Sequence, residues 1–205
     1  MAINLQKGQK IDLRKTSAAG LGEILVNLNW NSTPIAPVQR GFLASLFSAP
    51  QNGIDLDLGC LYELKDGKKG AVQALGNSFG LLKAPPYVSL DGDDRTGASA
   101  GGENVRINGD QVSKIKRVLV YTFIYSGIAN WQQADAVVTI KYPGAEDIIV
   151  RMDSFDSSRK MCALALFENN NDVTFSVQKI VQFFSGHQEM DTAFGWGLKW
   201  VAGRK

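Results

Sequence analysis

Short runs of alternating apolar and polar residues dominate the chain, and turn residues separate them. The clearest run covers residues 23–30, where Ile24, Val26, Leu28 and Trp30 share one face and Leu25 lies on the other. A period of two is typical of a β-strand with one buried and one solvated face. The apolar runs at 54–64 and 115–125 predict two further strands.

Three turn signals predict hairpins between later runs. Asp66-Gly67 follows the run at 54–64, and Pro143-Gly144 separates residues 134–142 from 147–152. Residues 169–172 separate 161–167 from 173–184. The chain therefore predicts about eight to ten strands of ordinary length. Helical patterns between the strands are missing, which favours an all-β fold over a parallel α/β sheet. We predict a two-sheet antiparallel β-sandwich with short helical segments, one of them at 188–194.

The composition fits one globular domain spanning residues 1–205. The chain is 44% hydrophobic and 20% charged. Its net charge of +2 does not indicate the excess of basic residues that nucleic-acid binding requires. Its first residues do not resemble a signal peptide, and apolar runs long enough to cross a bilayer are missing, so we expect a cytoplasmic protein. An insert at about residues 31–53 interrupts the strand pattern. Its apolar residues Phe42, Leu43, Leu46 and Phe47 have helical spacing. The segment either caps the sandwich or docks on a protein or membrane surface.

Cysteine and histidine usage excludes several kinds of chemistry. Cys60 and Cys162 each lie in an apolar run and are expected to be buried, reduced thiols. His187 is the only histidine, and we interpret it as a surface residue. Two cysteines and one histidine do not suit a structural zinc site. The aromatic segment 194–200 is expected to pack as a last strand or over a sheet edge, with a partner-binding surface as the alternative.

The most informative stretch is acidic and rich in glycine. Residues 91–97 read Asp-Gly-Asp-Asp-Arg-Thr-Gly, and three carboxylates in four residues repel one another unless solvent or a cation screens them. Calcium takes about six to eight oxygen ligands, and such a loop can supply several of them. Asp55 and Asp57 also share one face of a predicted strand. Two interpretations are open. Either residues 91–97 form a solvated acidic turn and Asp55 and Asp57 lie on a solvent-facing strand edge, or the two segments converge on one ion.

Several motifs resemble the TerD family of bacterial tellurium-resistance and stress proteins. They are the opening at 5–13, the strand at 24–30, Asp55-Leu56-Asp57, the segment 92–97, close to the family's Gly-Asp-Asn-Arg-Thr-Gly, and Arg151-Met152-Asp153. The resemblance implies a β-sandwich that binds Ca²⁺ through its acidic loops. By motif position, the implied calcium ligands are Asp55, Asp57, Asp91, Asp93, Asp94 and Glu103. Arg95 would orient one of these carboxylates.

The chain departs from the family pattern in two places. Family members carry a dense acidic run after Arg-Thr-Gly, whereas residues 98–103 contain one acidic residue, Glu103. Trp30 is followed by Asn31 where the family has aspartate. Since calcium affinity follows the number of charged ligands, these departures predict weaker binding.

We therefore expect a calcium-binding stress-response protein that is not an enzyme and acts as a scaffold. Its expected partners are other proteins of a stress-response complex, including a peripheral membrane-associated one, and not nucleic acid. Two alternatives from other classes stay open at this point. One is a metal-dependent hydrolase that uses metal-bound water, and the other is a domain that binds a small ligand through a calcium bridge.

Overall fold

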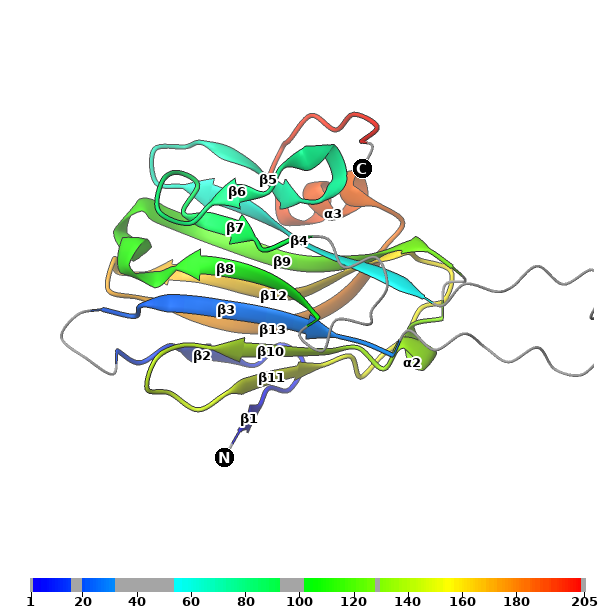
Figure 1. The fold of residues 1–205 in the computed structure, drawn as a ribbon, viewed down its shortest axis with the longest axis horizontal. Coiled ribbons are helices and arrows are strands. Elements are labelled where there is room, and N and C mark those ends of the chain that lie inside the picture. The colour runs from blue at the N-terminus through cyan, green and yellow to red at the C-terminus, as the bar shows by residue number, and fades with distance from the viewer. Residues whose placement is uncertain (1, 16–19, 32–53, 93–101, 128–129, 204–205) are drawn as a thin grey trace, which may run out of the picture.

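Two β-sheets pack face to face in the computed structural model, which describes residues 2–15, 20–31, 54–92, 102–127 and 130–203 (Figure 1). The seven-stranded sheet has the order β1 (Ile3–Asn4), β11 (Ile148–Arg151), β10 (Val137–Lys141), β3 (Glu23–Asn29), β8 (Glu103–Asn108), β7 (Val88–Leu90), β6 (Gly80–Leu81). The six-stranded sheet has the order β2 (Lys10–Asp12), β13 (Thr174–Phe184), β12 (Met161–Asn170), β9 (Ile115–Ser126), β4 (Asp55–Leu64), β5 (Lys69–Gln73).

All pairs of neighbouring strands are antiparallel in these residues except β1 with β11. Two short α-helices, α2 (Trp131–Ala134) and α3 (His187–Phe194), and two 3₁₀ turns, η1 (Leu75–Asn77) and η2 (Gly109–Lys114), connect or follow the strands. The structure thus confirms the predicted two-sheet β-sandwich with short helical segments.

The alternating run at 23–30 forms β3, whose Ile24, Val26 and Leu28 are fully buried between the sheets. The predicted hairpin at Asp66-Gly67 joins β4 to β5, and Gly67 has a φ of 87°, which glycine adopts without strain. The other two predicted hairpins join β10 to β11 and β12 to β13. Very short strands such as β1 and β6 were not predicted, because two residues are too few to show a periodic pattern.

A second apolar cluster covers the outer face of the six-stranded sheet. It combines strand residues with the C-terminal segment, and its buried members are Leu61, Leu119, Tyr121, Phe123, Met161, Ala163, Phe184, Met190 and Trp196. Helix α3 and the C-terminal segment lie beside β4 and β5 at the top of Figure 1, and their side chains pack on this face. The aromatic C-terminus was expected to form a strand or cover a sheet edge. It covers a sheet face instead, because the outward side chains of β4, β9 and β12 are apolar.

One carboxylate holds the C-terminal segment in place. Asp191 is 4% exposed and accepts hydrogen bonds from the backbone nitrogens of Gly197 and Leu198 and from Nε1 of Trp200. Trp196 is 1% exposed, so it anchors the sheet and is not available to a partner.

The remaining sequence predictions divide between described and undescribed residues. Cys60 and Cys162 are free and buried, as predicted, and burial raises the pKa of the Cys60 thiol to about 12. The insert at 31–53 lies outside the described residues except for Asn31.

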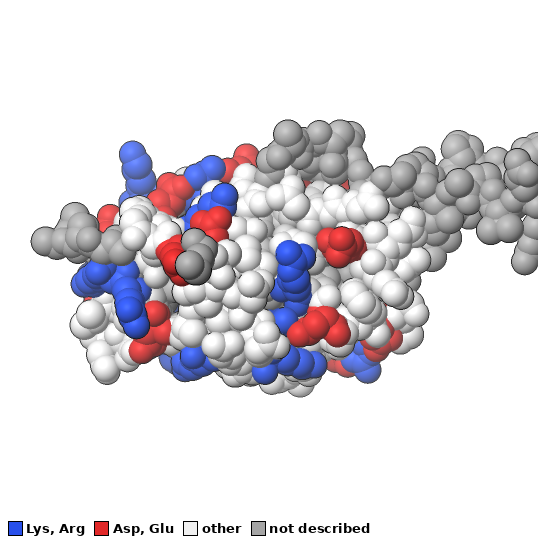
Figure 2. Space-filling model, turned by 90° about the horizontal axis from the view of Figure 1, so that it is seen from below, with Lys and Arg blue, Asp and Glu red and all other residues white. Residues whose placement is uncertain are grey.

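No helix in the described part of the chain is long and apolar enough to cross a membrane. Figure 2 shows acidic and basic side chains interspersed over one face, without a large area of one sign among the described residues.

Candidate cation site

The candidate site lies where β4 loses one of its neighbours. Strand β9 pairs with β4 along its whole length, whereas β5 pairs only with residues 59–63, from Gly59 opposite Gln73 to Glu63 opposite Lys69. Residues 55–58 therefore have an edge that β5 does not cover. The backbone N–H of Leu58 donates to Glu103 Oε2 at 2.6 Å, so a side chain from β8 replaces the missing strand.

Three of the six predicted ligands are buried carboxylates at this end of β4. Asp55 is 9% exposed, Asp57 is 1% exposed and Glu103 is 2% exposed. Asp55 and Asp57 are two residues apart in one strand, and the Glu103 carboxylate reaches the backbone next to Asp57. The interpretation of Asp55 and Asp57 as a solvent-facing strand edge is therefore wrong. Burying ionised carboxylates is unfavourable unless other groups compensate their charge.

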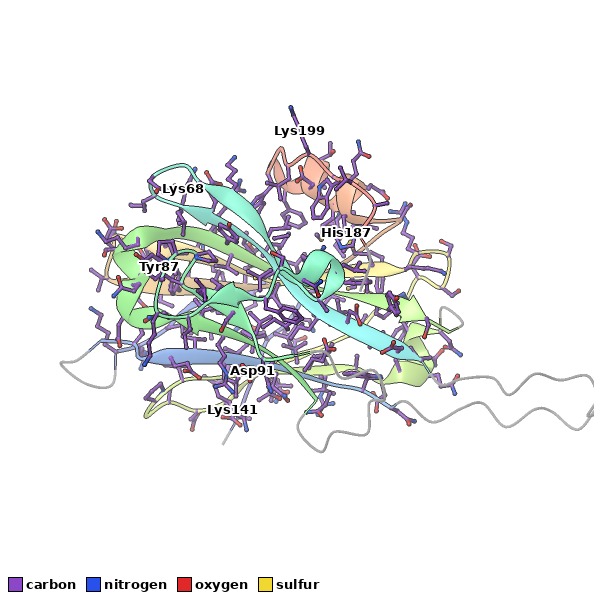
Figure 3. The ribbon with its side chains drawn as sticks, turned by 45° about the horizontal axis from the view of Figure 1, so that its top comes forward. Lys68, Tyr87, Asp91, Lys141, His187 and Lys199 are labelled. Atoms are coloured by element: carbon purple, nitrogen blue, oxygen red, sulfur yellow. The ribbon has the colours of Figure 1, made fainter. Side chains whose placement is uncertain are left out.

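Asp91 has a different environment. It follows β7, and its two carboxylate oxygens accept hydrogen bonds from Nε and Nη2 of Arg106 at 2.5 Å each. Arg106 also pairs with Glu23. Burial alternates along β8, so Arg106 lies on the outer face of the seven-stranded sheet and Glu103 on the inner face. Asp91 is labelled in Figure 3. The sequence analysis missed Arg106, because alternation along β8 shows its face but not its partner.

The other two predicted ligands, Asp93 and Asp94, lie outside the described residues, as does Arg95. Among the described residues, no group of three or more His, Cys, Asp or Glu side chains could hold a metal ion by itself. Asp55, Asp57 and Glu103 offer only oxygen atoms, the ligands that suit a hard cation such as calcium. Further oxygens from residues 93–101 would be needed to complete a coordination shell.

Neighbouring hydrogen bonds position the start of β4. Trp30 Nε1 donates to the carbonyl oxygen of Ile54 at 2.9 Å, which ties the residue before β4 to the end of β3. Thr122 Oγ1 donates to the carbonyl oxygen of Asp57 at 2.9 Å. These contacts give the Trp30 position of the sequence motif a physical role, since they place the backbone that carries Asp55 and Asp57.

A second polar group lies beside the acidic end of β4. Tyr121 Oη donates to Gln73 Oε1 at 2.5 Å, and the same oxygen lies 2.9 Å from His187 Nε2. The His187 ring contacts the rings of Tyr121, Phe123 and Trp200, with centroid distances of 5.5, 5.2 and 4.7 Å.

His187 was interpreted as a surface residue, and it is instead partly buried by these rings. Burial among the aromatic rings lowers the pKa of its imidazole to about 4, so it is neutral at physiological pH. Burial also raises the pKa of Tyr121, with smaller contributions from the Cys60 and Asp57 charges.

Gly59 is a sequence signal that could have indicated this second group. A Cβ atom at Gly59 would lie 2.9 Å from Cε2, Cζ and Oη of Tyr121, so the tyrosine ring lies directly across the glycine. A glycine inside an otherwise apolar strand indicates such a close approach, but not which ring makes it.

Comparison with known proteins supports the resemblance seen in the motifs. A family model described as the TerD domain matches residues 1–178. The chain is 44% identical over 203 residues to the tellurium resistance protein TerA of an Alcaligenes species, covering 99% of this chain and 58% of that protein. It is 36% identical over 137 residues to the stress response protein SCP2 of Bacillus subtilis (strain 168), covering 64% of this chain and 65% of that protein. The chain thus spans less than two thirds of the length of both relatives.

Solved structures share the fold at lower sequence identity. A homologue of the telluride resistance protein TerD from Streptomyces coelicolor A3(2) superposes with a TM-score of 0.55 at 19% identity, covering 84% of this chain and 95% of that one. The protein SAV2460, described as having unknown function, superposes with a TM-score of 0.59 at 14% identity, covering 88% of this chain and 99% of that one. These two similarities concern the fold alone.

Proposed function

Since this chain belongs to the TerD family of tellurium-resistance and stress-response proteins, we propose that it binds calcium and acts as a non-enzymatic scaffold in a stress response. The observation that carries this proposal is the burial of three carboxylates, Asp55, Asp57 and Glu103, at one end of β4. A divalent cation would neutralise several of these charges together. The relatives are named as resistance and stress-response proteins, and this supports a role without catalysis.

The position of the carboxylates explains how an ion would act as a structural element. Asp55 and Asp57 belong to β4 in the six-stranded sheet, and Glu103 belongs to β8 in the seven-stranded sheet. An ion held by residues of both sheets would link them at this end of the sandwich. It would also hold residues 93–101, which supply the remaining predicted ligands Asp93 and Asp94. The loops at this end would then present one fixed surface to a partner protein.

We propose other proteins of a stress-response complex as the partners, in the cytoplasm or at the periphery of a membrane. In sequence, the segment 31–53 lies between β3 and β4, and Trp30 and Ile54 on either side of it are joined by a hydrogen bond. Calcium binding would therefore also influence a segment whose apolar residues suit docking.

Calorimetry and thermal unfolding with calcium test the proposal. Calcium at about 100 times its dissociation constant should stabilise the fold by about 2.7 kcal/mol. For a chain of this size, that raises the melting temperature by roughly 5–10 °C. Asp57→Asn should weaken binding by about tenfold or more, because it removes one of few charged oxygens.

The matched control is Asp172→Asn, which removes an exposed carboxylate that pairs with Lys65 at the β12–β13 turn. Asn tolerates the φ of 60° at this position, so the control should fold normally and bind calcium like the wild type. Absence of both binding heat and thermal stabilisation in the wild type would refute calcium binding.

A further inference from the structure

An open cleft of about 870 Å³ lies beside α3, and its lining residues come from the stretch 185–193 and from Trp200 and Val201. Binding sites for small molecules usually have volumes of about 300–1,000 Å³, so the cleft is large enough for one. The predicted calcium ligands that the structure describes are not among its lining residues. Ligand binding here would therefore be independent of the proposed calcium function.

His187, the first residue of α3, is held in a fixed position at this cleft (Figure 3). Its Nε2 lies 2.9 Å from Gln73 Oε1. Its ring contacts the ring of Trp200, which also lines the cleft, and the rings of Tyr121 and Phe123 on β9. One polar contact and three aromatic contacts thus fix the orientation of the imidazole.

The buried hydroxyl of Tyr121 determines which atom Gln73 presents to His187. Tyr121 is fully buried, and among the described residues its hydroxyl has one hydrogen-bond partner, Gln73 Oε1 at 2.5 Å. A buried hydroxyl needs an acceptor for its proton, so Gln73 presents its amide oxygen and not its NH₂ group. An amide oxygen only accepts, so His187 must donate to it through a protonated Nε2.

The second ring nitrogen of His187 is then an unprotonated acceptor. Burial lowers the pKa of the imidazole to about 4, so the ring carries one proton at physiological pH, and this proton is on Nε2. Gln73 does not line the cleft, so Nε2 points away from it and Nδ1 is the ring nitrogen available there. Among the described residues, none donates a hydrogen bond to Nδ1.

The other lining groups suit an uncharged, flat ligand. Trp200 contributes the apolar surface of its indole ring, and its Nε1–H already donates to Asp191 at 3.1 Å. Glu189 is the one charged residue among the described lining residues, and its carboxylate accepts from the Ser185 nitrogen and pairs with Arg159 at 2.7 Å each. A charged ligand would therefore find no free partner of opposite sign among these residues, whereas an aromatic ring can pack against Trp200.

We propose that this cleft binds an uncharged aromatic heterocycle or phenol, and that His187 Nδ1 accepts a hydrogen bond from the N–H or O–H of its ring. Trp200 supplies the contact surface for the ring. Tyr121 and Gln73 are positioning residues, because they act through His187 and do not line the cleft.

Indole and 1-methylindole test the proposal as a matched pair of probes on the wild-type chain. Indole has a ring N–H, whereas 1-methylindole lacks it and is more apolar. Indole should bind about fivefold more tightly in calorimetry, because it keeps one additional hydrogen bond. A site that selects by apolar surface alone would prefer 1-methylindole. Equal or tighter binding of 1-methylindole would therefore overturn the proposal, as would absence of saturable indole binding.

NMR spectroscopy locates the binding site, because the chain contains one histidine and every imidazole signal comes from His187. Long-range ¹H–¹⁵N spectra of the free protein should show a protonated Nε2 and an unprotonated Nδ1. Indole should shift the Nδ1 signal saturably, with the same affinity that calorimetry gives. A protonated Nδ1 in the free protein, or an Nδ1 signal that indole does not move, would overturn the assignment of His187 as the acceptor.

Tyr121→Phe tests how the acceptor is set up. The variant keeps the buried ring but removes the hydroxyl, so Gln73 is free to turn its NH₂ group to His187 and the imidazole proton can move to Nδ1. The preference for indole over 1-methylindole should then fall toward one, and the spectra should show the Nδ1–H tautomer. Lys199→Ala, which removes an exposed side chain next to Trp200 that does not line the cleft, should behave as the wild type. An unchanged tautomer in Tyr121→Phe would overturn the positioning role of Tyr121.

Discussion

The Glu103 carboxylate accepts a hydrogen bond from the backbone nitrogen of Leu58 at 2.6 Å, so a side chain of the seven-stranded sheet pairs with a backbone N–H at an edge of the six-stranded sheet. Edge strands expose backbone groups that need a partner, and β4 loses β5 at this point. The Glu103 carboxylate, which accepts from the residue after Asp57, therefore has a structural role in addition to any role in calcium binding. The two roles can be separated by substitution.

Glu103→Ala should destabilise the calcium-free protein by about 1–3 kcal/mol, because it leaves the buried Leu58 N–H without its acceptor. Glu103→Gln keeps an oxygen acceptor and should lose less stability while weakening calcium binding. Urea unfolding in the presence of a chelator measures the first effect, and calcium calorimetry measures the second. Equal stability of the two variants would argue against the structural role.

Asp91→Asn should change calcium affinity much less than Asp57→Asn. The Asp91 carboxylate already binds Arg106 through both oxygens, and it would have to leave that pair to bind an ion. The ion pair is partly exposed, so the variant should lose no more than about 1 kcal/mol of stability. Parallel titrations of the two variants check this, and similar losses of affinity would support Asp91 as a ligand.

Asp191→Ala should release the C-terminal segment from the six-stranded sheet. The substitution removes the acceptor of two backbone N–H groups and of Trp200 Nε1, and we expect a loss of about 2–4 kcal/mol. Limited proteolysis should cleave after residue 194 faster in this variant. Asp191→Asn, which keeps one acceptor oxygen, should show an intermediate rate, and unchanged cleavage in both variants would contradict the proposed anchoring.

His187 should make stability depend on pH in the mildly acidic range. Its pKa is lowered to about 4 in the folded protein, compared with 6.5 for the free side chain, so the unfolded state binds the proton first. Stability is then complete above pH 6.5 and falls as the pH drops toward 4, by at most about 3 kcal/mol.

Urea unfolding at pH 7, 6, 5 and 4.5 measures this dependence, with His187→Gln as the control. The control should lose stability at pH 7 but show a flatter profile between pH 6.5 and 4.5. Carboxylates with lowered pKa values, such as Glu63 and Asp153, lose their contribution at lower pH. A wild-type profile as flat as that of the control would show that His187 is not buried in its neutral form.

Alternation and turn residues were sufficient to predict most of the architecture. Ile24, Val26 and Leu28 define a buried face by their spacing alone, and Asp66-Gly67 marks a hairpin because glycine accepts a positive φ. The pairing of β1 with β11 could not be predicted, because neither strand contains information about a neighbour more than a hundred residues away.

The acidic residues show the same division. Their spacing predicted that Asp55 and Asp57 share a face, but it did not predict that both are buried or that Glu103 reaches Leu58 from the other sheet. His187 was interpreted as exposed because its sequence neighbours are polar, whereas its three aromatic neighbours come from β9 and the C-terminal segment.

The sequence by itself determined the class of fold, its main strands and the family, because these depend on local periodicity, turn chemistry and short motifs. Only the tertiary structure decided which charges are buried and which residues meet, including Asp91 with Arg106 and Gln73 with both Tyr121 and His187. The physical reason is that burial and hydrogen bonding depend on distances across the two sheets. Those distances follow from how the strands are ordered and how far β5 extends along β4, and sequence spacing does not contain them.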